Sequence, residues 1–179
     1  MVKERTLLVA AGLSIAGLLV AGAARPQADK PTFARTTIDL GVVVSDVAKA
    51  AHFYGNVLGF TEAGGFSVSG EMAGACGLTD SLPFKVRVFV LDKEPTATRL
   101  KIMEIPGSAS KRVDNTTIGS TLGFSYLTVR VSDLSGMLDR LKTHQAGPVK
   151  KPYQLGGNNY LALVKDPDGN IIELIGPMN

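Results

Sequence analysis

A short segment of this chain occurs twice, and the repeat constrains the fold more than any other feature. The first copy, VVVSDV, spans residues 42–47, and the second, VRVSDL, begins 87 residues later at Val129. Each copy contains a run of β-branched residues, typical of a strand, followed by a Ser-Asp pair of the type that begins helices. Because an internal repeat indicates a duplicated structural unit, we expect two related modules.

The residues after each copy continue the likeness. Apolar residues recur at helical spacing, over residues 47–58 in the first half and 134–141 in the second. Three further strands are expected in each half, at residues 60–66, 86–91 and 100–105 and at residues 149–152, 160–165 and 171–175. The glycine-rich segment 67–83 is expected to be a mobile loop. This order predicts an α+β fold of two tandem βαβββ modules, residues 36–106 and 121–177.

The first 24 residues are expected to lie outside this domain. A charged start precedes an uncharged stretch of 18 residues, 7–24, and Ala21-Gly22-Ala23 offers a small-residue cleavage site. This order is that of a secretory signal peptide, and the stretch also reaches the length of an N-terminal membrane anchor. A buried helix of the domain is the weakest of the three interpretations. The first two place the protein outside the cytoplasm, periplasmic or secreted, with residues 25–35 as a linker.

The charge and the scarce metal-binding residues exclude several classes of protein. The net charge is +3 and the isoelectric point about 9.0, but the basic residues are scattered and do not alternate with aromatic ones, so no nucleic-acid partner is expected. A single cysteine, Cys76, excludes a disulfide framework and a zinc ribbon. Two histidines exclude a three-histidine metal centre. His52 is expected to be exposed, and His144 follows the second helix, where a cation is favoured.

Several motifs accompany the repeat. Phe53-Tyr54 and Leu58-Gly59-Phe60 end the first helix, and DPDGNIIEL, residues 166–174, closes the second half with a turn that places Gly169 in the left-handed conformation. Together with the repeat, these motifs resemble the vicinal oxygen chelate superfamily over residues 36–176. That superfamily includes glyoxalase I, extradiol dioxygenases, fosfomycin-resistance enzymes and bleomycin-binding proteins. The resemblance implies a glyoxalase-like domain at residues 36–177, whose two modules form a half-barrel cleft for a divalent metal or a ligand.

The resemblance also implies four candidate metal ligands, one on the first and one on the last strand of each module. They are Asp39, Glu104, Tyr126 and Glu173. The superfamily most often has histidine on the first strands, so a conventional two-histidine, two-glutamate site is absent. Three carboxylates and a phenol are hard oxygen ligands, which suit magnesium, manganese or calcium better than zinc. Alternation along the strands places Glu104 and Glu173 on apolar strand faces, where a carboxylate is costly unless it is paired, hydrated or bound to a metal.

Two functions follow, and the residues do not choose between them. In the first, an exported glyoxalase-like domain binds a small organic molecule with divalent-metal-assisted lyase, isomerase or dioxygenase-type chemistry, and Glu104 or Glu173 acts as ligand or general base. In the second, a metal-free protein of the bleomycin-resistance type, often a homodimer, sequesters its ligand. The glutamates then bond to Tyr126 or to two arginines proposed to line the substrate cleft, Arg87 and Arg130, or face solvent. Arg130 as an ordinary surface residue is the alternative.

Overall fold

The computed structural model describes residues 33–179. The predicted signal peptide or anchor, residues 1–24, and most of the predicted linker lie outside the described residues. Within the described part of the chain, no helix is both long enough and apolar enough to cross a membrane. Residues 35–179 form a single folded unit that contains both predicted modules.

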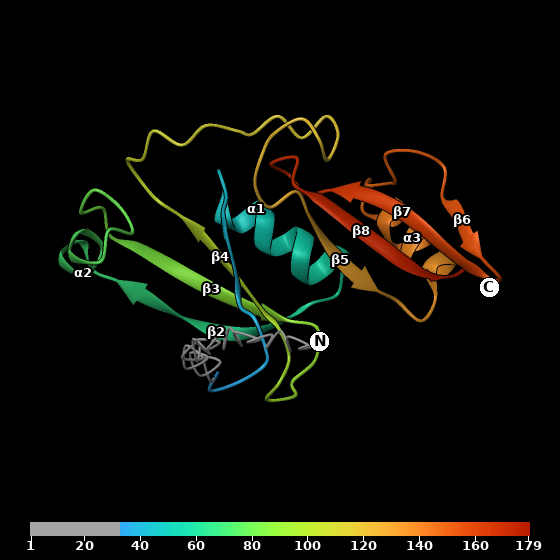
Figure 1. Ribbon diagram of the computed structural model, residues 1–179, viewed down its shortest axis with the longest axis horizontal. Coiled ribbons are helices and arrows are strands. Elements are labelled where there is room, and N and C mark those ends of the chain that lie inside the picture. Colours follow the sequence, from blue (N-terminus) through green and yellow to red (C-terminus); the bar gives the residue numbers. More distant parts are fainter. Residues whose placement is uncertain (1–32) are drawn as a thin grey trace, which may run out of the picture. The chain divides into compact units, whose positions relative to one another are not determined.

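The first module is a four-stranded sheet with its first helix packed against one face (Figure 1). Its elements are β1 (Leu40–Val43), α1 (Val47–Ala51), the π-helix η1 (His52–Val57), β2 (Thr61–Val68), α2 (Gly70–Ala75), β3 (Phe84–Val90) and β4 (Arg99–Glu104). The strand order is β1-β4-β3-β2, with β1 parallel to β4 and the other neighbours antiparallel. The sheet of this module is called sheet one.

The second module repeats this arrangement. Its elements are β5 (Tyr126–Arg130), α3 (Leu134–Thr143), β6 (Tyr153–Gly156), β7 (Asn159–Lys165) and β8 (Ile171–Pro177). Its four strands form a second sheet, called sheet two. The strand order β5-β8-β7-β6 matches that of sheet one, and β5 is parallel to β8. The predicted α+β fold of two tandem βαβββ modules is therefore confirmed. The repeated strand–helix pattern was sufficient to predict it because each copy forms the same pair of a strand and a capped helix.

The helix of the first module begins as an α-helix and ends as a π-helix. Asp46 caps it, since its Oδ1 accepts hydrogen bonds from two amides of the first turn at 3.0 and 2.9 Å. From His52 the turns widen, and the Leu58 amide donates to the Phe53 carbonyl five residues back, at 2.9 Å. The apolar spacing predicted one helix here but did not reveal the wider turns.

Both modules contribute to one hydrophobic core. Ile102 of β4, Leu174 of β8, and Leu134 and Leu141 of α3 are fully buried. Burying each such side chain contributes about 1.5–3 kcal/mol to the free energy of unfolding. The core lies between the sheets and their helices, so α1, η1 and α3 cover one face of each sheet. On the opposite face of sheet one, α2 packs over part of β2 and β3 in a second, smaller hydrophobic cluster.

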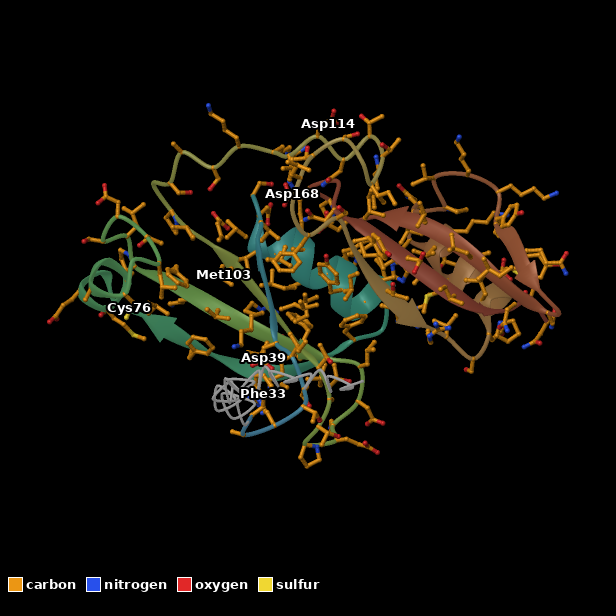
Figure 2. The ribbon with its side chains drawn as sticks, in the orientation of Figure 1. Phe33, Asp39, Cys76, Met103, Asp114 and Asp168 are labelled. Atoms are coloured by element: carbon orange, nitrogen blue, oxygen red, sulfur yellow. The ribbon has the colours of Figure 1, made fainter. Side chains whose placement is uncertain are left out.

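Hydrogen bonds join the modules at the turn between β7 and β8. Asp166 in this turn is 5% exposed and accepts a hydrogen bond from the Tyr54 hydroxyl of η1 at 3.0 Å. Asp168, two residues on, accepts hydrogen bonds from both the amide and the hydroxyl of Ser45, where the chain enters α1 (Figure 2). Gly169 has a φ of 88°, as the DPDGN pattern predicts.

Two expectations about the connecting segments are wrong. Residues 149–152 form no strand, and β6 starts only after Pro152, because a proline has no amide hydrogen to donate to a neighbouring strand. The segment 67–83 is not a simple loop. It contains α2, which Ser69 caps through its hydroxyl, and Ala73 of this helix is fully buried against sheet one.

Candidate ligand-binding site

Strand alternation gives β4 two chemically different faces. Leu100 and Ile102 point toward α1 and the core, at 3% and 0% exposure. Arg99 and Lys101 point to the opposite face, because successive side chains of a strand alternate. The same rule applies to β8, where Ile172 and Leu174 are in the core and Glu173 lies on the opposite face.

The strand registers show which residues of the two modules correspond. Gly41 of β1 is paired with Lys101 of β4, and Thr128 of β5 is paired with Glu173 of β8. Gly41 and Thr128 are separated by the 87 residues of the repeat, so Lys101 is the counterpart of Glu173. The expectation that Glu104 and Glu173 occupy matching places is therefore wrong. The structure places the two glutamates on opposite kinds of sheet face.

Glu104 lies on the helix side of sheet one. Its Oε2 accepts a hydrogen bond from the Val47 amide at 3.2 Å, the first amide of α1. A carboxylate at this place neutralises the positive end of the helix dipole and satisfies an amide that has no partner within the helix. The cost of placing Glu104 beside apolar residues is thus offset by a structural contact with α1.

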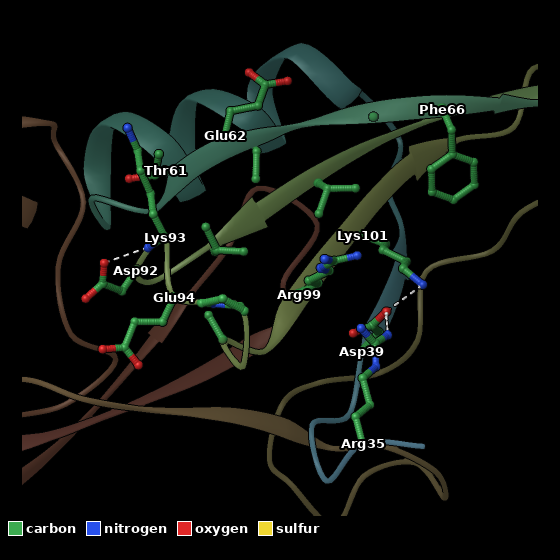
Figure 3. A pocket seen from close by; sticks show the side chains of 16 residues that line it. Arg35, Asp39, Thr61, Glu62, Phe66, Asp92, Lys93, Glu94, Arg99 and Lys101 are labelled. Carbon is green, nitrogen blue, oxygen red and sulfur yellow. Dashed lines mark hydrogen bonds and ion pairs between the residues drawn. The ribbon is translucent and has the colours of Figure 1, made fainter. Parts of the chain in front are cut away.

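Asp39, just before β1, is held by two cations. Lys101 Nζ lies 3.0 Å and Arg35 Nη2 2.8 Å from its Oδ2 (Figure 3). The hydrogen bond from Lys101 lowers the pKa of this carboxyl below its usual value, and desolvation opposes that shift only in part. The Oδ1 atom is buried and has no hydrogen-bond partner among the residues that the structure describes. Asp39 is therefore ionised and retains one free acceptor.

Tyr126 and Glu173 belong to sheet two. Tyr126 is 51% exposed and lines a cavity of about 290 Å³ together with Asp39, so the structure brings these two predicted residues to one place. Glu173 Oε2 accepts a hydrogen bond from the Thr128 hydroxyl at 2.7 Å. This neutral partner satisfies the carboxylate without a cation.

The two arginines predicted to line the cleft have different surroundings. Arg87 of β3 is paired in register with Ile102, so it lies on the helix side. It makes a bidentate ion pair with Glu62, at 2.7 Å for both contacts, and stacks over the Phe89 ring at 5.5 Å. Arg130 of β5 is exposed, and no ion pair joins it to another residue of the described range.

A larger cavity, the sheet-one cavity, lies on the face of sheet one away from α1. Its volume is about 590 Å³, within the range typical of small-molecule sites. Val88 and Val90 of β3 form an apolar floor, and Phe66 of β2, 50% exposed, adds an aromatic ring. The charged side chains around it, shown in Figure 3, are Arg35, Asp39, Asp92, Lys93, Glu94, Arg99 and Lys101. The Glu62 side chain points away from it, to the helix side, where it pairs with Arg87.

The donors on this face do not fit a divalent metal ion. Between residues 33 and 179, no group of three or more His, Cys, Asp or Glu side chains is arranged to hold one. Where the second module has the carboxylate of Glu173, the first has the ammonium of Lys101, which already pairs with Asp39. A bound dication beside a lysine ammonium would be repelled, and hard cations require oxygen ligands that this position cannot supply.

The cations of the sheet-one cavity were not among the predicted site residues. Arg35 precedes the first strand and carried no motif. Arg99 and Lys101 alternate with buried Leu100 and Ile102, and this alternation is a signal that indicates which face is open to solvent. The predicted site residue of this strand was Glu104, which lies on the apolar face with Leu100 and Ile102.

The sequence is similar to a known protein family and to one named protein. A family model described as the Glyoxalase/Bleomycin resistance protein/Dioxygenase superfamily matches residues 34–174. A curated protein of Vibrio parahaemolyticus, named probable lactoylglutathione lyase, is 41% identical over 58 residues. That match covers 29% of this chain and 38% of the relative, so the chain matches well under two thirds of the relative's length.

Solved structures share the arrangement of the two modules. A glyoxalase family protein from Bacillus cereus superposes with a TM-score of 0.71 at 21% identity, over 84% of this chain and 99% of that one. Glyoxalase I from Leishmania major gives a TM-score of 0.57 at 19% identity, over 79% and 86%. At these identities the likeness shows the fold alone. The family match over most of the chain goes further, and the chain belongs to the glyoxalase/bleomycin resistance protein/dioxygenase superfamily.

Proposed function

We propose that this domain binds a small organic anion in the sheet-one cavity without a metal ion. The observation that carries the proposal is the ion pair of Lys101 with Asp39, 3.0 Å long, at the position whose counterpart in the second module is Glu173. A fixed ammonium there supplies a positive charge as part of the protein. This charge favours the function of a metal-free binding protein.

The lining of the cavity supports an anion with an apolar body. Arg99 and Lys93 lie at the cavity and make no ion pair with another described residue. A guanidinium binds a carboxylate or phosphonate through two parallel hydrogen bonds. The valine floor and Phe66 offer apolar contact. These features together favour a carboxylate or phosphonate ligand with an apolar body.

A second candidate is a metal-dependent lyase, which the name of the Vibrio relative favours. Superfamily members commonly use divalent metals, and the 41% identity over 58 residues is the support for such chemistry here. Asp39, Tyr126 and Glu173 would then act as ligands, with Glu104 and Glu173 as the predicted catalytic carboxylates. The two functions differ in whether ligand binding survives removal of metal.

Calorimetric titration of a panel of aromatic and aliphatic carboxylates tests the proposal. With chelator present, we expect at least one carboxylate to bind, and Arg99→Met and Lys101→Met each to weaken it about tenfold or more, as loss of a charged hydrogen bond implies. Lys142→Met, at an exposed lysine of α3 outside the sheet-one cavity, is the matched control and should leave binding unchanged. Binding that requires added metal, or that ignores Arg99 and Lys101, contradicts the proposal.

We also propose that the protein is exported, as the sequence of residues 1–24 indicates. Fractionation of the cells that produce it, followed by N-terminal sequencing, tests this proposal. A mature start near Ala24, or an intact chain in the membrane fraction, supports export with a cleaved signal or with an anchor. An intact Met1 in the cytosolic fraction contradicts both. The predicted homodimer stays a prediction, to be checked by light scattering of the purified protein.

A further inference from the structure

The only two histidines of the chain lie next to each other in the fold. His52 opens η1 of the first module, and His144 ends α3 of the second. Their ring centroids are 5.6 Å apart and the ring planes meet at 69°. Both side chains are exposed, and both line a cavity of about 490 Å³ that lies on the helix side of the modules and shares no residue with the sheet-one cavity.

The separation of the rings suits a shared metal ion. With nitrogen–metal bonds of about 2.1 Å and a ring centroid about 1.2 Å behind each nitrogen, two imidazoles on a tetrahedral ion have centroids about 5.4 Å apart. The observed 5.6 Å is close to that distance. Because both side chains are exposed, each ring can rotate about its Cβ–Cγ bond and turn a nitrogen toward the ion.

The backbone holds the two rings at this distance. The amide of His144 donates to the Leu141 carbonyl at 3.0 Å, so His144 is fixed to the end of α3. Arg140, one turn earlier, donates to the carbonyls of Asn56 and Val57 at 2.6 and 2.8 Å, which fixes α3 to the end of η1. Two ligands that are held in place before binding lose little conformational entropy when the ion binds.

The donor type indicates which ions would bind. Neutral imidazole is a ligand of copper, nickel and zinc, whereas magnesium, calcium and manganese prefer oxygen. Asp46 lines the same cavity, but its carboxylate already accepts the amides of α1 and pairs with Lys49 at 3.2 Å. Water would therefore fill the remaining coordination positions.

We propose that His52 and His144 form a binding site for a divalent transition-metal ion of the copper, nickel and zinc group, and that the ion links the two modules. The site is independent of the sheet-one cavity and of the ligand proposed there. Its affinity follows the order of these metals for nitrogen ligands, highest for copper.

Titration with Cu²⁺ and Zn²⁺, followed by calorimetry and by electron paramagnetic resonance for copper, tests the site. We expect one ion per chain, a copper spectrum with two nitrogen ligands, and a higher thermal midpoint with zinc. His52→Gln and His144→Gln should each weaken copper binding at least tenfold, and the double variant should bind no more weakly than either single one, since one ring alone cannot chelate.

Lys142→Gln provides a matched control, because it introduces the same exposed glutamine on α3 without removing a ring. It should leave the copper affinity within twofold of the wild type. The three histidine variants should keep the wild-type thermal midpoint in chelator, which shows that they are folded. Copper binding that keeps the wild-type affinity in the double variant, or losses that simply add from one histidine to the other, would overturn the proposed site.

Discussion

Lys101 is the single residue on which the chemistry of the proposed site depends most. Its ammonium lies 3.0 Å from Asp39 Oδ2, and its place in sheet one corresponds to that of Glu173 in sheet two. One amino-acid difference between the two modules thus exchanges a negative charge for a positive one.

Lys101→Met tests the strength of this ion pair. At pH 7 we expect a loss of about 0.5–1 kcal/mol in the free energy of unfolding, as for other partly exposed pairs. The lowered pKa of Asp39 determines the pH dependence. The contribution of the ion pair to the free energy of unfolding is complete above the pKa that Asp39 has in the unfolded state, and it disappears as the pH falls through the lower pKa of the folded state. Urea unfolding should therefore show a smaller difference in free energy of unfolding between the wild type and Lys101→Met at pH 3 than at pH 7. An equal difference at both pH values contradicts the pairing.

Tyr54→Phe tests the buried contact between the modules. Removing the hydroxyl that donates to Asp166 at 3.0 Å should cost about 1.5–3 kcal/mol, as for a hydrogen bond to a charged group. Burial, and then the charge of Asp166, raise the pKa of Tyr54. The wild type therefore has this stability in full below the unfolded-state pKa of about 10 and loses it progressively as the pH rises from there toward the raised pKa of the folded state. The gap between the unfolding midpoints of the two proteins should be smaller at pH 10.5 than at pH 8, and a constant gap would contradict this role.

At the scale of single elements, β4 shows why the sequence predicted the fold better than the site. Val42 and Val129 are 87 residues apart, as the repeat requires, but their strand partners Ile102 and Leu174 are only 72 apart. The first module has gained residues around α2 between its first and last strands. The DPDGN turn marks the register of β8, and β4 has no such marker. The sequence therefore predicted Glu104 as the counterpart of Glu173, whereas the true counterpart, Lys101, lies on the opposite face of β4.

The first helix depends on Glu104, and a pair of substitutions tests this dependence. Glu104→Ala removes the acceptor of the Val47 amide and the charge near the helix N-terminus, and we expect a loss of about 1 kcal/mol. Glu104→Gln keeps an acceptor and should lose about half as much. Urea unfolding in chelator measures both. The contrary result is that both variants are as stable as the wild type in chelator and less stable than the wild type when metal is present. Glu104 would then be a metal ligand, as the sequence predicted, rather than a helix cap.

At the scale of the whole molecule, the two modules share a core and are joined on two sides. The turn between β7 and β8 bonds to Ser45 and Tyr54, and Arg140 of α3 bonds to the end of η1. The internal repeat predicted two modules, but nothing in the repeat predicted these contacts. Apart from Ser45, which has a serine counterpart at Ser132, they depend on residues that differ between the copies, and a repeat identifies only what the copies have in common.

Manganese binding tests the central claim most directly, because Mn²⁺ is a hard ion that prefers the oxygen ligands predicted for the cleft over the paired histidines. Free Mn²⁺ is measured by electron paramagnetic resonance during titration of dialysed protein, with Asp39→Asn and Glu173→Gln alongside. We predict no binding by any of the three proteins up to about 1 mM, the weak limit of biological sites for hard cations. One Mn²⁺ bound per chain, and lost in both variants, would contradict a metal-free site.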